Sequence, residues 1–107
     1  MKGEKLVETR IPEEEKEQRV AELNGWKLED EKFIVKRYRF KEFLTGVQFV
    51  NQVAEYSEEI QHHPFISIDY KRVTMKLTSW NAKGLTELDL DCAKKYDQMY
   101  EQMVKEQ

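Results

Sequence analysis

Two stretches of the chain alternate apolar and polar side chains with the period of two that is typical of half-buried β-strands. The first begins at Trp26, turns through polar residues 29–32 and continues over 33–40. The second covers 65–70 and 73–78, with Lys71 and Arg72 between its halves. A short connection between two such runs predicts a β-hairpin, although Lys-Arg is an unusual turn, since tight hairpin turns prefer Gly or Asn. The pattern therefore predicts four strands in two hairpins.

Three other stretches repeat apolar residues at spacings of three and four, which predicts amphipathic helices. The first opens at Ile11-Pro12 with three glutamates and ends at Asn24-Gly25. The last opens at Thr86, with Asp89 in the place of the usual Glu of a capping box, and continues to about residue 105. The longest covers residues 41–61, and its expected buried stripe consists of Phe43, Leu44, Val47, Val50, Val53, Ala54, Ser57 and Ile60.

The resulting order is α-β-β-α-β-β-α, which indicates an α+β fold. We expect a four-stranded antiparallel sheet with three helices packed on one face. Residues 1–10 are polar and predict an N-terminal arm, and no linker divides residues 11–107. A chain of 107 residues is long enough for a single domain with one core.

Composition and charge narrow the classes of function. The chain has 18 basic and 21 acidic residues, a net charge of −3 and no basic run, which disfavours direct binding of nucleic acid. Its one cysteine, Cys92, cannot form an internal disulfide and suits a reducing compartment. Neither an apolar leader segment nor a stretch of about 18 apolar residues is present. We therefore expect a soluble cytoplasmic protein that has no contact with the membrane.

The candidate chemistry lies where the longest helix ends. His62 and His63 are the only histidines, and Pro64 follows them and disfavours helical geometry at His63. Glu58 precedes His62 by four residues, so on a helix the two side chains share a face. The helix dipole and this carboxylate should both raise the pKa of His62, which suits a general acid near neutral pH. His63 should point in a different direction.

These residues alone leave a structural interpretation open. A histidine at a helix end is often only a cap, and a Glu–His pair on a helix surface contributes a few tenths of a kcal/mol. A metal site is disfavoured because adjacent histidines cannot easily bind one ion and the HExxH spacing is absent. We therefore expect no metal.

A wider set of residues resembles the signature of the pterin-4a-carbinolamine dehydratases. The set comprises Glu58, His62-His63-Pro64, Tyr70, Trp80 and Asp89 within Gly84-Leu85-Thr86-Glu87-Leu88-Asp89. The resemblance extends to Gly25-Trp26, to Tyr38-Arg39-Phe40-Lys41, to the helix with Phe43 and Phe49, and to the last helix. It covers nearly the whole chain after residue 10. The combined spacing of these residues is specific for the family, whereas no single part of it would be.

The resemblance implies a fold and a reaction. Family members have a four-stranded antiparallel sheet and three helices, which matches the predicted order. They dehydrate 4a-hydroxytetrahydropterin to quinonoid dihydropterin in tetrahydropterin recycling, without a metal or bound cofactor, and commonly form homodimers or homotetramers. In animals they also serve as a dimerisation cofactor of a homeodomain transcription factor. A pterin-binding or protein-binding regulatory module with weak catalysis is therefore the alternative expectation.

The resemblance also implies a role for each matching residue. His62 would be a general acid, His63 would bind and orient the pterin, and Glu58 would hold or polarise His62. Asp89 and Trp26 would shape and support the pocket.

Trp80 departs from the animal enzymes, which have a third histidine at this position. An indole N–H is only a donor, so Trp80 cannot act as a general acid at neutral pH. It could stack on the pterin or form a pocket wall, or it could simply anchor a loop. If two histidines divide protonation of the two faces of the substrate, this protein should be less active or more stereoselective.

Overall fold

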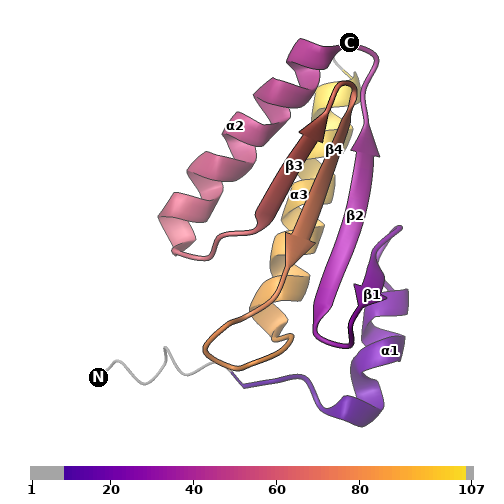
Figure 1. The fold of residues 1–107 in the computed structure, drawn as a ribbon, viewed down its shortest axis with the longest axis vertical. Coiled ribbons are helices and arrows are strands. Elements are labelled where there is room, and N and C mark those ends of the chain that lie inside the picture. The colour runs from indigo at the N-terminus through magenta and orange to yellow at the C-terminus, as the bar shows by residue number, and fades with distance from the viewer. Residues whose placement is uncertain (1–8, 106–107) are drawn as a thin grey trace.

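The computed structural model describes residues 9–105, and the fold has the predicted class and element order. Most of the predicted N-terminal arm, residues 1–8, lies outside the described residues. The elements are α1 (Glu13–Ala21), β1 (Lys27–Glu29), β2 (Phe33–Arg39), α2 (Phe43–Ile60), β3 (Phe65–Asp69), β4 (Arg72–Leu77) and α3 (Glu87–Lys105) (Figure 1).

The four strands form one antiparallel sheet in the order β1-β2-β4-β3, so the two hairpins meet through β2 and β4. α3 lies behind the sheet in the view of Figure 1, and α2 lies beside β3 in contact with α3. α1 contacts β1 at the other edge. In the described part of the chain, no helix covers the opposite face of the sheet, which is turned toward the viewer in Figure 1 and which we call the open face. No helix within residues 9–105 has the length and apolar character needed to span a membrane.

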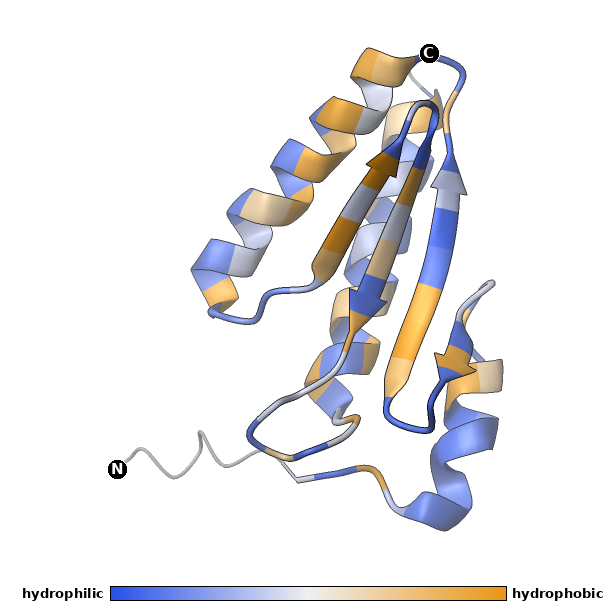
Figure 2. Cartoon of the chain, viewed as in Figure 1, coloured by the Kyte–Doolittle hydropathy of each residue, from blue (hydrophilic) through white to orange (hydrophobic). Residues whose placement is uncertain are grey.

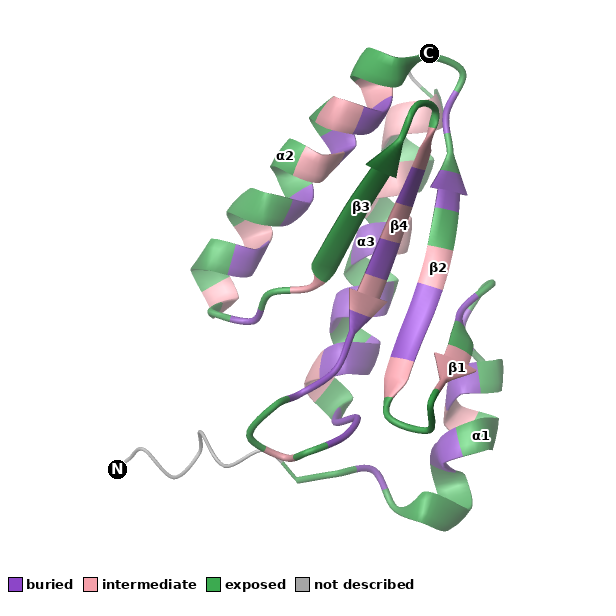
Figure 3. Ribbon diagram, in the orientation of Figure 1, coloured by how far each residue is buried: buried purple, intermediate pink, exposed green. Residues whose placement is uncertain are grey.

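Alternation along the central strands creates the core, as the period of two predicts. Val73, Met75 and Leu77 of β4 are fully buried, while the residues between them are partly exposed (Figure 3). Ile34 and Tyr38 of β2 lie on the same buried face. Residues of α3 cover this face, among them Leu90, Cys92, Ala93 and Tyr96.

The turn of the second hairpin differs by one residue from the prediction. β3 ends at Asp69 and β4 begins at Arg72, so the turn residues are Tyr70 and Lys71 rather than Lys71 and Arg72. Arg72 pairs with Asp69 on one side and with Arg39 on the other, which makes it a strand residue. Tyr70 supplies the positive φ, at 56°, that a tight hairpin turn requires.

The expected buried stripe of α2 is wrong in part. Phe43 and Leu44 are 45% and 65% exposed, and Ala54 is exposed as well. The buried residues are Gly46, Phe49, Val53 and Ser57. The helix has apolar side chains on two adjoining faces, and only one of them meets the sheet and α3. The stripe predicted from the sequence combined both faces. It therefore included residues that stay exposed in a single chain.

The edge strand β3 is exposed along its whole length (Figure 3). Its apolar residues Phe65, Ile66 and Ile68 are 49%, 37% and 40% exposed. Figure 2 shows hydrophobic residues along both β3 and the neighbouring α2. We call Phe43, Leu44, Ile66 and Ile68 the α2/β3 surface.

Candidate active site at the end of helix α2

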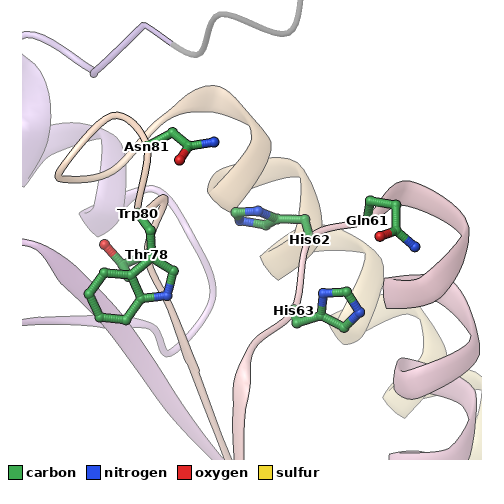
Figure 4. A pocket seen from close by; sticks show the side chains of 6 residues that line it. All are labelled: Gln61, His62, His63, Thr78, Trp80 and Asn81. Carbon is green, nitrogen blue, oxygen red and sulfur yellow. The ribbon is translucent and has the colours of Figure 1, made fainter.

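The histidine corner is formed by a reversal of the backbone after α2. Gln61 has a left-handed conformation, with φ 55° and ψ 46°, and ends the helix. The backbone N–H of His62 then donates to the carbonyl of Ser57 over 3.1 Å, and the Gln61 side chain donates to the carbonyl of Glu58 over 2.7 Å. These bonds satisfy carbonyls that a helix end otherwise leaves without partners. The two histidines consequently leave the corner in different directions (Figure 4).

His62 is buried and is held by a carboxylate from another element. Its Nε2 lies 2.7 Å from Oδ1 of Asp89, which is in the first turn of α3 and is fully buried. The other carboxylate oxygen accepts hydrogen bonds from the Ser79 hydroxyl, at 2.7 Å, and from the Thr86 backbone N–H, at 2.9 Å. The bond from Thr86 is one of the two reciprocal bonds of a capping box, while the Thr86 hydroxyl lies 2.9 Å from the Ser79 hydroxyl. These contacts offset the cost of burying a carboxylate and fix its position against His62.

The expected pairing of Glu58 with His62 is not what the structure shows. Oε2 of Glu58 lies 2.7 Å from Nε2 of His63, five residues along the chain. The left-handed Gln61 breaks the helical geometry on which the i, i+4 expectation depended. Asp89 therefore makes the contact with His62 that the sequence assigned to Glu58. The Glu58 and His63 side chains are 73% and 52% exposed, so their pairing adds little stability.

Both histidines line a pocket with a volume of about 270 Å³, close to the lower end of small-molecule sites. Its lining residues are Gln61, His62, His63, Thr78, Trp80 and Asn81 (Figure 4). The histidines come from the loop between α2 and β3, and the last three residues follow β4. Figure 4 shows Trp80 across the pocket from the two imidazoles.

Trp80 is 65% exposed and belongs to an aromatic cluster at the open face of the sheet. Its ring meets Phe33 and Phe65 edge to face, with centroid distances of 6.3 and 5.9 Å. Such contacts stabilise a defined ring position while one face of the indole stays accessible. Trp80 thus provides an aromatic wall opposite two groups that can exchange protons.

The structure brings most of the predicted site residues together. His62, His63 and Trp80 line the pocket, Asp89 lies behind His62, and Glu58 contacts His63. Trp26 lies in the core, outside the set that lines the pocket. It packs against Tyr38 and Tyr96, and its Nε1 donates to Asp97 over 3.3 Å.

Sequence reasoning missed Gln61, Thr78, Asn81 and Ser79. The Thr78-Ser79 pair offers a weak signal, because two hydroxyl residues end a strand just before the expected loop. Gln61 offers none, since a left-handed Gln at a helix end is uncommon. The arrangement can hold a planar ring against Trp80 and move protons through imidazole.

Comparisons with known proteins identify the family of the chain. The sequence model of a family described as "Pterin 4 alpha carbinolamine dehydratase" matches residues 9–99. A relative from Picosynechococcus sp., whose name assigns it to the pterin-4-alpha-carbinolamine dehydratases, is 38% identical over 91 residues, covering 85% of this chain and 98% of the relative. A relative of the same name from Sulfolobus acidocaldarius is 33% identical over 90 residues, covering 84% and 98%.

Two solved structures have the same fold. The crystal structure of a transcriptional coactivator/pterin dehydratase from Brucella melitensis superposes with a TM-score of 0.80 and 33% identity, covering 86% of this chain and 99% of that one. A pterin dehydratase-like protein identified as a RuBisCO assembly factor in the alpha-carboxysome gives a TM-score of 0.63 at 22% identity, covering 72% and 90%. The second likeness concerns the fold alone.

Proposed function

The chain belongs to the pterin 4 alpha carbinolamine dehydratase family, and we propose that it dehydrates 4a-hydroxytetrahydropterin to quinonoid dihydropterin in tetrahydropterin recycling. The observation that supports this most strongly is the joint placement of His62 and His63 in one pocket, with His62 held by the buried Asp89. The proposed setting is the cytoplasm, which suits a chain whose single cysteine is a free thiol.

The reaction requires acid–base work at two places on the substrate. The bond from C4a to the hydroxyl oxygen breaks, and that oxygen leaves as water after it receives a proton. The adjacent ring nitrogen loses its proton, and a C=N bond forms between that nitrogen and C4a. Imidazole suits both transfers near neutral pH, and the chain's own residues suffice without a metal or cofactor in the proposal.

His62 is the proposed general acid. Its ring is buried and oriented by Asp89, so that a proton can be delivered in a fixed direction. His63 is half exposed and oriented by Glu58, and its proposed role is to bind and orient the pterin. Glu58 acts in this proposal through His63 rather than through His62.

Trp80 is the proposed stacking wall for the pterin ring. Its indole can donate a hydrogen bond but cannot deliver a proton at neutral pH. If the animal enzymes protonate the two faces of the substrate from two histidines, the present pocket has an acid on one side only. We therefore expect turnover to favour one stereoisomer of the 4a-hydroxyl.

The test is a direct assay of the dehydration. 4a-hydroxytetrahydropterin is generated in the cuvette, and its decay is followed by absorbance with and without a catalytic amount of the protein. We expect a rate above that of buffer that is proportional to protein concentration. A decay rate equal to that of buffer at every protein concentration would contradict the proposal.

A second candidate function is a regulatory module that binds pterin or protein with weak catalysis. The exposed α2/β3 surface favours it, because large apolar patches on a folded chain mark interaction sites. The Brucella melitensis structure is described as a transcriptional coactivator as well as a dehydratase. Saturable binding of a pterin without turnover would favour this candidate over the enzyme.

A self-association proposal rests on the same surface. β3 is an uncovered edge strand, and exposed edges with apolar side chains pair readily with another chain. The adjoining apolar face of α2 would be covered in the same contact or in a second one. The proposed assembly is accordingly a homodimer or homotetramer.

A further inference from the structure

The β3–β4 hairpin turns at the opposite end of the sheet from the histidine corner (Figure 1). Residues at this turn line a second pocket. It has a volume of about 320 Å³ and is lined by Arg39, Asp69, Tyr70, Lys71 and Arg72. Three cationic side chains and one carboxylate therefore share one concave site. The net charge of the whole chain is −3, so this concentration of positive charge is local.

The strand register places two of these positive charges opposite each other, which destabilises the sheet when no anion is bound. Arg39 of β2 lies directly opposite Arg72 of β4, and like charges in opposed positions destabilise a sheet. Asp69 lies opposite Arg72 on the other side. Its Oδ2 accepts a hydrogen bond from Ser67, and no ion pair joins it to Arg72 within residues 9–105.

Arg39, Lys71 and Arg72 form no ion pair with a carboxylate within residues 9–105. Most other lysines and arginines of this range are also unpaired, and Lys16, Arg19, Lys36 and Lys76 are the exceptions. What sets Arg39, Lys71 and Arg72 apart is that the three unpaired cations line one pocket.

One further feature distinguishes the hairpin end. The Nε of Arg72 is buried and has no hydrogen-bond partner in the described part of the chain, although buried donors are nearly always satisfied.

We propose that this pocket binds a phosphate group through Arg39, Lys71 and Arg72. A guanidinium can donate two parallel hydrogen bonds to phosphate oxygens, and the lysine adds a mobile point charge. The negative charge of the bound anion would offset the repulsion between Arg39 and Arg72. One of its oxygens would also accept a hydrogen bond from the buried Nε–H of Arg72. The site is independent of the proposed dehydratase pocket, and its test does not depend on turnover.

The test is a titration of the ¹⁵N-labelled protein with inorganic phosphate, followed by amide chemical shifts at constant ionic strength maintained with chloride. We expect saturable shifts centred on residues 69–72 and on Arg39. Arg72→Gln should weaken the fitted affinity about tenfold, and Lys71→Gln, in the exposed turn, should weaken it as well. Lys94→Gln removes an exposed lysine from α3 and should leave the affinity unchanged.

Shifts that do not saturate, or equal affinities in the Lys71→Gln and Lys94→Gln variants, would overturn the proposal. Because Lys71 is an exposed turn residue, its variant keeps the test valid if Arg72→Gln does not fold. A parallel titration with adenosine monophosphate distinguishes the sources of the phosphate. Tighter binding than inorganic phosphate indicates a phosphate ester, whereas equal or weaker binding indicates the free anion.

Discussion

The carboxylate of Asp89 connects three segments of the chain. It caps the start of α3 through Thr86, anchors the loop after β4 through Ser79, and holds His62 after α2. A buried carboxylate with these partners supports stability and site geometry together. The sequence identified Asp89 through its capping spacing and family resemblance. Its contact with His62 could not be predicted from spacing along a helix or strand, because 27 residues separate the two positions.

Replacing Asp89 by Asn keeps the size of the side chain and removes its charge. The amide cannot accept hydrogen bonds on both of its terminal atoms, so at least one donor loses its partner. We expect a loss of about 2–3 kcal/mol in the free energy of unfolding, measured in urea, and a lower kcat. Asp91→Asn, an exposed change on the same helix, should alter stability by less than about 0.5 kcal/mol. Equal stabilities of the two variants would contradict the assigned role of Asp89.

Cys92 provides a pH-dependent prediction. Burial, together with the nearby charge of Asp89, raises the pKa of the thiol from 9.0 to about 12. Between these values the unfolded thiol is ionised while the folded thiol keeps its proton, so the free energy of unfolding falls as pH rises. Cys92→Ala removes this contribution, which approaches about 1.4 kcal/mol per pH unit.

The measurement for Cys92 is urea denaturation of both proteins at pH 8, 9, 10 and 11. Tyrosines titrate in the same range, and those that do not interact with Cys92 cancel in the difference. Tyr56 and Tyr96 interact with the thiol, so the difference reports the thiol together with these two tyrosines. Stability differences that stay constant across the series would show that the thiol is ionised equally in the folded and unfolded states.

At the scale of elements, α2 has two apolar faces with different roles. The stripe of Gly46, Phe49, Val53 and Ser57 faces the core, and a Cβ on Gly46 would lie 3.3 Å from side-chain atoms of Phe40 and Val73. The face with Phe43 and Leu44 is uncovered in the single chain. The core of one chain therefore does not account for all of the apolar residues in this helix.

Two alanine substitutions in α2 distinguish its faces. Phe49→Ala, at a fully buried position, should lower the free energy of unfolding by about 3–5 kcal/mol. Leu44→Ala should change it by less than about 0.5 kcal/mol at protein concentrations at which sedimentation detects only the monomer. Chemical denaturation of both variants provides the comparison. If Leu44→Ala lowered the free energy of unfolding by several kcal/mol at high dilution, Leu44 would belong to the buried face, as the sequence predicted.

The period of the hydrophobic pattern, together with helix start and stop signals, identified the helices and strands that the structure shows within residues 9–105. It failed at contacts that depend on tertiary structure. The pattern could not show which apolar face of α2 the sheet covers, or that Tyr70 rather than Lys71 begins the hairpin turn. At the site it placed His62 and His63 correctly at the end of α2. It could not predict the left-handed conformation of Gln61, because of which Glu58 contacts His63 rather than His62.

At the scale of the whole molecule, the α2/β3 surface lies on one side of the sheet while the histidine pocket lies at the end of α2. We expect the chain to form a dimer or tetramer through that surface. Ile68→Glu introduces a charge on the exposed edge strand and should shift sedimentation toward the monomer. Lys83→Glu, an exposed change in the loop after β4, is the matched control. A wild-type chain that sediments as a monomer at high concentration would contradict the expectation.

The measurement that tests the proposed function most directly is the dehydration kcat of the His62→Gln variant relative to wild type. Loss of a positioned general acid lowers a rate by about 10²- to 10⁴-fold, so we predict a decrease in that range with the fold intact by circular dichroism. Lys94→Gln, an exposed change on α3 outside the pocket lining, should retain the wild-type activity. A kcat for His62→Gln within a factor of about two of wild type would contradict the assignment of His62 as the acid.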